Sequence, residues 1–263
     1  GRIGWLMKYA LRRFFRIAPM YYLGIVIYFF WSFAKNYTQN GVLAPLPQYT
    51  LGNILANVFF IHGFIPEAYN NIVPGGWSIG TEMAFYVLFP CVFLLYRTIN
   101  RPLLLSGFLI AGCYLLVSLV QWWLDQTTAG SDFLYFNIAN QLQVFVIGMF
   151  GFYYLPVICR LHPVFLCLVI FFFGALGYNF WTLPMHNARF LALAAYASAF
   201  VGLAALAART KFKGAWLGEI GRRSFSMYVV HFLFMNIIDY SFNHGNGLLT
   251  SYPNLKALVH FGA

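Results

Sequence analysis

Charged side chains are scarce in this sequence, and acidic ones are the scarcer kind. Only 8% of the 263 residues are Asp, Glu, Lys or Arg, whereas an ordinary soluble domain carries about 25%. Apolar residues reach 61%, and the mean hydropathy is +0.71. Because so few polar side chains cannot coat a water-facing globule of this size, the composition excludes a soluble enzyme, a disordered protein and a nucleic-acid-binding domain.

Motifs for metals, disulfides and common cofactors are also missing. The four cysteines form no CxxC pair, and no two histidines have HxxxH spacing. There is no GxSxG elbow, no Walker A loop and no GxGxxG fingerprint. We therefore expect no metal site and no bound cofactor, and we interpret the cysteines as small core residues: Cys91, Cys113, Cys159 and Cys167.

Long apolar runs are abundant, and they predict an all-α, polytopic transmembrane helix bundle. Seven runs come close to the roughly 20 residues that a spanning helix needs. An eighth begins near Leu255, whereas the short run 54–65 is predicted to be re-entrant or interfacial. The predicted full spans are 17–34, 78–96, 103–123, 134–155, 163–182, 189–208 and 224–241.

The distribution of basic residues supports this set of spans. If 54–65 does not cross, all of the 16 Lys and Arg residues except Lys35, Arg189 and Lys256 fall on one side. An excess of Lys and Arg marks the cytoplasmic side of a membrane protein. The net charge of +10 is therefore interpreted as a topology signal, with no nucleic acid as a partner.

Three arginines lie at the start of the first predicted span. Arg13 and Arg16 are three residues apart and share a helix face, and Arg12 lies on a neighbouring stripe. Guanidinium groups bind phosphate oxygens in a fork and stay charged at any working pH. The arginines suit a phosphate-rich cytosolic donor at the inner mouth of the bundle. They equally suit plain positive charge beside a cytoplasmic helix end, which is the commoner reason for such residues.

A polar stripe lies on the second predicted span. A Pro-Gly-Gly break at 74–76 precedes the helix, and Ser78, Glu82 and Tyr86 then recur every four residues. An acidic residue inside a spanning helix costs roughly 2.5–3.5 kcal/mol and usually faces a partner or a water-filled cavity. We interpret Glu82 as a catalytic or acceptor-orienting group, with Ser78 and Tyr86 in support. The alternative is a structural carboxylate bonded to a Tyr or Arg.

A third polar group lies at the start of the last full span. Ser224, Tyr228 and His231 share one helix face. A buried imidazole can accept a proton from a hydroxyl group, so His231 is a second catalytic candidate, with Tyr228 and Ser224 in support. The alternative is a core histidine that bonds to a Tyr or a backbone carbonyl. His62, in the short run 54–65, is a weaker candidate for lining a cavity.

Taken together, the three stretches resemble the acyltransferase-3 family of integral membrane acyltransferases. The matching motifs are R-x-x-R-I-x-P at 13–19, W-S-x-x-x-E-x-x-F-Y at 77–86 and G-x-x-S-F-x-x-Y-x-x-H at 221–231. The resemblance implies a bundle of about ten helices in one membrane-embedded acyltransferase domain. It also implies that the arginines serve the donor side, and that an essential histidine lies on a helix upstream of Gly1. We therefore expect the 263 residues to be truncated at both ends.

The resemblance also implies an activity. Members transfer an acyl group, often acetyl, from cytosolic acyl-CoA to a hydroxyl of a cell-envelope or exported carbohydrate. We therefore expect an O-acyltransferase that modifies a polysaccharide or glycolipid, in a multi-pass arrangement in a bacterial inner membrane. The alternative is a transporter or flippase-like protein in which Glu82 and His231 relay protons or bind a substrate. A non-catalytic structural subunit is a third interpretation.

Overall fold

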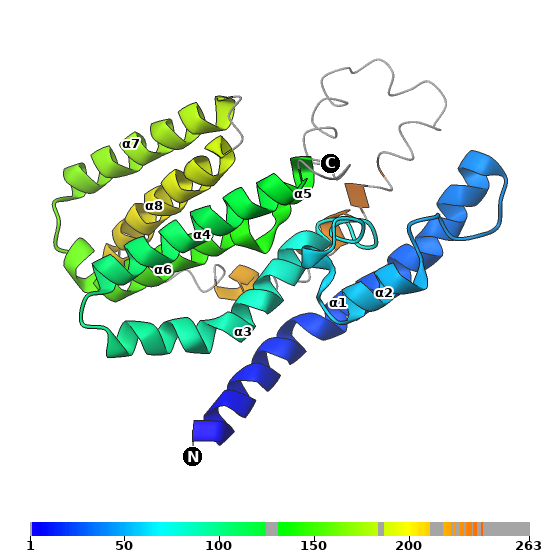
Figure 1. Cartoon of the computed structure of the whole chain (residues 1–263), viewed down its shortest axis with the longest axis horizontal. Helices are drawn as coiled ribbons and strands as arrows, with labels where there is room; N and C mark the ends of the chain where they lie inside the picture. Colours follow the sequence, from blue (N-terminus) through cyan, green and yellow to red (C-terminus); the bar gives the residue numbers. More distant parts are fainter. Residues whose placement is uncertain are drawn as a thin grey trace. The chain divides into compact units, whose positions relative to one another are not determined.

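The computed structural model describes residues 2–124, 131–183 and 187–210, together with some residues between 218 and 238. These residues form helices joined by turns, and no β-strand occurs among them (Figure 1). The elements are α1 (Arg2–Asn40), α2 (Leu51–Val58), the 3-10 helix η1 (His62–Phe64), α3 (Gly76–Thr98), α4 (Pro102–Leu124), α5 (Ser131–Phe136), α6 (Ile138–Ile158), α7 (Pro163–Thr182) and α8 (Ala188–Arg209).

Six of the described helical segments are long and apolar enough to cross a membrane. They are Gly4–Asn40, Gly76–Thr98, Pro102–Leu124, Asp132–Ile158, Pro163–Thr182 and Ala188–Arg209. Each contains or closely overlaps one of the first six predicted spans, which confirms the helical membrane bundle. Of the predicted span 224–241, the described residues are helical. The predicted segment near Leu255 lies outside the described residues.

The short run between the first two spans forms two separate pieces. Helix α2 has only eight residues, which is about 12 Å of helix and far less than the membrane core. The Thr50 side chain caps it by accepting from Asn53 N at 3.2 Å, and Phe60 ends it with a positive φ of 59°. This run is therefore not among the six described segments that are long and apolar enough to cross a membrane, and its re-entrant or interfacial placement remains a prediction.

The charge distribution makes a testable prediction about sidedness. Single cysteines placed in 35–77 should react with an impermeant maleimide from outside the cell, because that segment lies opposite the basic loops. Single cysteines in 209–223 should react only after the cells are permeabilised. Labelling both segments from the same side would show that the predicted set of spans is wrong.

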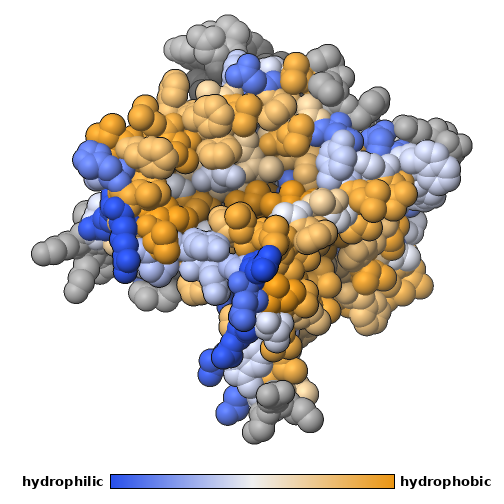
Figure 2. All heavy atoms as spheres, turned by 60° about the vertical axis from the view of Figure 1, so that its left-hand side comes forward, coloured by the Kyte–Doolittle hydropathy of each residue, from blue (hydrophilic) through white to orange (hydrophobic). Residues whose placement is uncertain are grey.

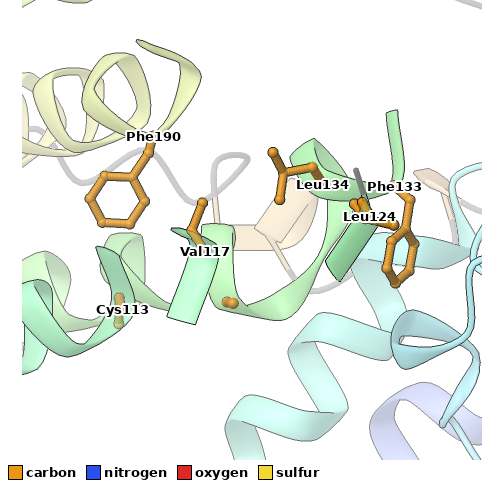
Figure 3. Close-up of a cluster of buried hydrophobic side chains, with 7 residues drawn as sticks. Cys113, Val117, Leu124, Phe133, Leu134 and Phe190 are labelled. Carbon is orange, nitrogen blue, oxygen red and sulfur yellow. The ribbon is translucent and has the colours of Figure 1, made fainter. Parts of the chain in front are cut away.

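The chain divides into two compact units, each described by itself. The first unit comprises Gly1–Phe14, Pro47–Ile72 and Gly76–Lys213. Within it α7 packs on α8, and α6 packs on both α4 and α8. One buried cluster joins α4, α5, α6 and α8 (Figure 3): Cys113, Val117, Leu124, Phe133, Leu134, Ala139 and Phe190. Burial of these apolar side chains fixes where α6 lies against its neighbours.

Small residues recur every four positions on α8, at Ala194, Ser198 and Gly202, and we call them the small-residue stripe. A Cβ on Gly202 would lie 2.8 Å from the Ile170 side chain of α7, so the two helices approach closely there. Ala194 and Ser198 instead line a cavity of about 420 Å³ between α4, α6, α7 and α8. The stripe therefore combines close packing at one end with open space at the other.

The second unit comprises Phe15–Leu46, Val73–Gly75 and Gly214–Ala263. In the α1 part of this unit, Ile17, Tyr21 and Tyr28 are buried. The Asn36 side chain donates to Ala44 O at 2.9 Å and holds the chain after the helix end.

Much of the surface is apolar, as a membrane environment requires. Figure 2 shows hydrophobic side chains over most of the visible face, with hydrophilic ones gathered in a few strips. Phe108 on α4 and Phe171 on α7 are each 77% exposed. Side chains of this size are exposed in such numbers only where lipid or a partner covers them.

Candidate active site

Arg13 of α1 lies against two tyrosine rings in the first unit. Its guanidinium carbon is 5.1 Å from the centroid of the Tyr86 ring and 5.6 Å from that of Tyr9. The two rings meet edge to face at 6.4 Å, and Tyr9 also stacks on Phe89 at 5.6 Å. A cation over an aromatic face is attracted by the ring quadrupole, and the attraction grows as water is excluded. The rings therefore fix the position of this arginine.

Tyr86 also joins the arginine to the acidic residue of α3. The Tyr86 hydroxyl donates a hydrogen bond to Oε1 of Glu82, one helical turn earlier. Glu82 and Tyr86 therefore share a face of α3, as their spacing predicted, and their hydrogen bond is the one that the structural alternative for Glu82 expects. The catalytic assignment of Glu82 remains a prediction. We call Arg13, Tyr86 and Glu82 the Arg13–Tyr86–Glu82 cluster. Its geometry places a carboxylate, a phenol and a guanidinium in a row within a spanning helix pair.

The contact with Tyr86 places Arg13 along α3. Tyr86 lies near the middle of the 23-residue α3, so Arg13 lies beside the midpoint of that helix and not beside its last turn, where Arg97 is found. The prediction that the arginines lie at the inner mouth of the bundle began the first span at residue 17, and it remains a prediction. Helix α1 instead continues without a break from Arg2, since Lys and Arg are good helix formers.

The other two arginines lie close by on the same helix. Arg12 and Arg16 are both exposed, whereas Arg13 is half-buried. The three residues span little more than one turn of α1, as their spacing predicted. Their exposed guanidinium groups remain available for an anionic ligand, and donor binding at Arg12 and Arg16 remains a prediction.

His62 proves to be a core residue that holds the start of α3. Its side chain is fully buried, and Nε2 donates to Gly76 O at 2.9 Å. A Cβ on Gly80 would lie only 2.9 Å from Nε2, so the helix can approach the ring only with glycine at that position. His62 therefore fixes the first turn of the helix that carries Glu82. The expectation that it lines a cavity is not met, because close packing surrounds the ring.

The protonation state of His62 affects the stability of this packing. Burial lowers the pKa of His62 below its usual value of about 6.5, and hydrogen bonds to the Gly76 and Ala56 backbone oppose this more weakly. The folded state thus holds the neutral ring. Its stabilising contribution is complete above pH 6.5 or so and is lost as the pH falls, because the unfolded chain then binds the extra proton.

Thermal unfolding should reveal this dependence. We expect the melting temperature of the purified protein to fall between about pH 7 and pH 5, and we expect His62→Gln to remove much of that slope. His162→Asn is the matched control, because His162 is exposed and its ring caps α7 by accepting from Val164 N at 3.3 Å. An unchanged slope in His62→Gln would show that His62 is not the titrating group.

A hydrogen bond from Tyr49 also holds the loop that leads into α3. The Tyr49 hydroxyl donates to Ile72 O at 3.1 Å, and burial raises the pKa of Tyr49 to about 12. Tyr49 therefore stays protonated and keeps this hydrogen bond throughout the physiological pH range. Together with His62, it gives the loop before Glu82 two fixed anchor points.

The third predicted group is found in the second unit, where it meets the Pro-Gly-Gly break. The Tyr228 hydroxyl donates to Gly75 O at 2.9 Å. Gly75 has a φ of +73°, and a Cβ there would lie 2.4 Å from the Phe232 ring, so both backbone and space require glycine. The interpretation of Tyr228 as a supporting residue gains a structural basis, because it holds this turn.

His231 and Ser224 extend from the same helical stretch. The His231 ring lies 5.4 Å from the Tyr228 ring and 3.9 Å from the Phe232 ring, measured between centroids. His231 is exposed, whereas both the catalytic interpretation and the core-histidine alternative assumed a buried imidazole. Ser224 Oγ donates to Gly221 O at 3.0 Å. The catalytic assignment of His231 remains a prediction.

The remaining predictions for the site concern Ser78, metal ligands and the cysteines. Ser78 is half-buried on α3, one turn before Glu82. In the part of the chain that the structure describes, no three His, Cys, Asp or Glu side chains lie close enough to hold a metal ion. The cysteines are free, and their interpretation as core residues holds for the buried Cys113 but is wrong for Cys91 and Cys167, which are exposed.

The sequence did not single out Tyr9, and it did not predict the packing contacts of His62 and Gly75. Tyr9 is four residues before Arg13, which is the spacing of neighbours on a helix face, so it was within reach of sequence reasoning. The contacts of His62 and Gly75 cross long stretches of chain, and local spacing carries no signal for them.

Comparison with known protein families shows which family the chain belongs to. The acyltransferase-3 family, described as an acyltransferase domain, matches residues 5–259. The chain therefore belongs to the acyltransferase-3 family and is a membrane acyltransferase. No curated protein and no solved structure matches the chain.

Proposed function

We propose that this protein moves an acyl group, most simply acetyl, from cytosolic acyl-CoA to a hydroxyl of a cell-envelope or exported carbohydrate. The observation that carries the proposal is the Arg13–Tyr86–Glu82 cluster, which places a carboxylate and a fixed guanidinium beside the middle of α3. Membership of the acyltransferase-3 family supports acyl transfer as the class of reaction. The cluster supplies a base and a cation, which are the two kinds of group that such a transfer needs.

The chemistry follows from the reacting bonds. The oxygen of the acceptor hydroxyl attacks the thioester carbonyl, and a base removes the hydroxyl proton, because a neutral alcohol is a poor nucleophile. A C–O bond forms, negative charge develops on the carbonyl oxygen, and the C–S bond then breaks. The thiolate of CoA leaves and takes up a proton.

Each residue of the site has a proposed part in these steps. Glu82 removes or orients the hydroxyl proton, and the Tyr86 hydroxyl holds its carboxylate in position. Arg13, with Arg12 and Arg16, binds the anionic donor, since guanidinium groups pair with phosphate oxygens. His231 is the second candidate base, with Tyr228 and Ser224 in support. No resident metal or cofactor takes part in this scheme, and acyl-CoA is a substrate.

Reconstitution tests the proposal directly. The full-length protein, in liposomes, receives acetyl-CoA labelled in the acetyl group, together with a mixture of carbohydrate acceptors extracted from a bacterial envelope. We expect label to appear in alkali-labile ester linkage on sugars, at a rate well above hydrolysis to free acetate. Label found only as free acetate, or sugar that crosses the membrane without being acylated, would contradict the proposal, and the second result would favour a transporter.

A further inference from the structure

A groove of about 570 Å³ lies between α3 and α6 in the first unit. Its volume is within the range of about 300–1,000 Å³ that is usual for ligand pockets. Apolar side chains form almost all of its walls, and the cationic part of the lining is Arg97. On α6 the lining includes Val144, Phe145, Gly148 and Phe152.

The α3 wall is a ladder of aromatic rings that ends in a cation. Phe85, Phe89 and Phe93 follow at four-residue spacing, with 5.8 Å between successive ring centroids. Phe85 stacks on Phe145 of α6 at 3.9 Å and closes one end of the groove. At the other end, the Arg97 guanidinium lies 5.9 Å from the Phe93 ring.

Arg97 is exposed, and it makes no ion pair with any described residue. The ladder from Arg97 to Phe85 is twelve residues long, or about 18 Å of helix. Half of the bilayer hydrocarbon core is about 15 Å. The groove thus has the length of one lipid leaflet, with a cation at the membrane surface and an apolar end near the midplane.

We propose that this groove binds an anionic phospholipid of the leaflet on the Arg97 side, which the charge bias identifies as cytoplasmic. The lipid phosphate pairs with Arg97, and one acyl chain lies along the phenylalanine ladder. Charge complementarity selects an anionic headgroup, because a basic side chain near the membrane surface attracts such lipids. The walls select a hydrocarbon chain, since they offer few hydrogen-bonding partners.

The ladder also adjoins the candidate active site. Phe89 lines the groove and stacks on Tyr9, whose ring lies below the Arg13 guanidinium. A chain in the groove would therefore support the ring that positions Arg13. This link to the active site rests on the proposed function, and it predicts that the bound lipid raises the rate of acyl transfer. Lipid binding itself does not depend on that function.

Two glycines allow a matched test of the groove. A Cβ on Gly148 of α6 meets no atom within 4 Å, so Gly148→Leu fills the groove without disturbing the helices. Gly107 of α4 lines the cavity of about 420 Å³ and is equally open, so Gly107→Leu is the control. Arg97→Gln removes the cation. Its control is Arg101→Gln, which changes an exposed arginine in the loop between α3 and α4.

The experiment measures lipids retained by the purified full chain in detergent, by native mass spectrometry, during titration with phosphatidylglycerol or phosphatidylcholine. We expect the unmodified protein to prefer phosphatidylglycerol by about fivefold or more. Arg97→Gln should remove this preference, and Gly148→Leu should reduce retention of both lipids. Both controls should behave as the unmodified protein.

Several results would overturn the proposal. Equal retention of the two lipids by the unmodified protein, or unchanged retention in Gly148→Leu, would show that the groove selects no phospholipid. Binding of palmitoyl-CoA in the same groove with no retention of phosphatidylglycerol would show that the occupant is a different amphiphile. If retention follows the prediction but acyl transfer in liposomes ignores phosphatidylglycerol, the lipid site stands and the step to the active site is wrong.

Discussion

Glu82→Gln should abolish most acyl transfer while leaving the protein folded. The amide keeps the shape of the carboxylate and can still accept from the Tyr86 hydroxyl, but it cannot take a proton. Loss of a general base costs about 10²- to 10⁴-fold in rate. We expect a fall of that size in kcat, with little change in the KM for acyl-CoA, measured with labelled acetyl-CoA in liposomes.

A neighbouring variant and a control make this result specific. Tyr86→Phe keeps the ring below Arg13 but removes the hydrogen bond to Glu82, so we expect a smaller loss of kcat. Glu67→Gln changes an exposed carboxylate in the loop before α3 and should leave activity unchanged. If Glu82→Gln remains active while Glu82→Ala fails to fold in detergent, the carboxylate is structural and its catalytic assignment is wrong.

The helices that cross the membrane could be predicted from the sequence because their signal is local. Each of α3, α4, α6, α7 and α8 follows from about 20 apolar residues between breaks. The contact between Glu82 and Tyr86 is equally local, since residues four apart are neighbours on a helix.

The extent of α1 was harder to predict, because composition and helix propensity disagree there. Lys8 and the three arginines raise the cost of membrane insertion, which led to a predicted span that begins at residue 17. The same residues favour helix, and the structure continues the helix through all of them. Hydropathy alone therefore does not show at which residue such a helix begins.

The contacts that define the candidate site are long-range, and no spacing rule predicts them. Tyr228 and Gly75 are 153 residues apart, and Arg13 meets Tyr86 across two other helical pieces of the chain. The sequence identified these residues by type and motif, but the structure alone pairs Arg13 with the aromatic face of Tyr86. The predicted donor arginine and the predicted acceptor-side stripe therefore belong to one cluster.

The largest effect on donor binding is expected from Arg13. Arg13→Ala should raise the KM for acyl-CoA by about 10- to 100-fold, because a hydrogen bond to a charged group contributes roughly 1.5–3 kcal/mol. Arg13→Lys should rescue poorly, since an ammonium group lacks the fork geometry and stacks less well on the Tyr9 and Tyr86 rings. Arg16→Ala should also weaken donor binding.

Arg189 provides the matched control for this prediction. Its guanidinium carbon lies 5.7 Å from the Tyr135 ring centroid and 5.9 Å from that of Trp181, an arrangement close to that of Arg13. Arg189→Lys therefore imposes the same loss of ring contact at another place in the first unit and should leave the KM for acyl-CoA unchanged. If Arg13→Lys is as active as the unmodified protein, Arg13 acts as a topology signal and the donor site lies elsewhere. If both lysine variants raise KM equally, the effect reflects general loosening of the fold and not donor recognition.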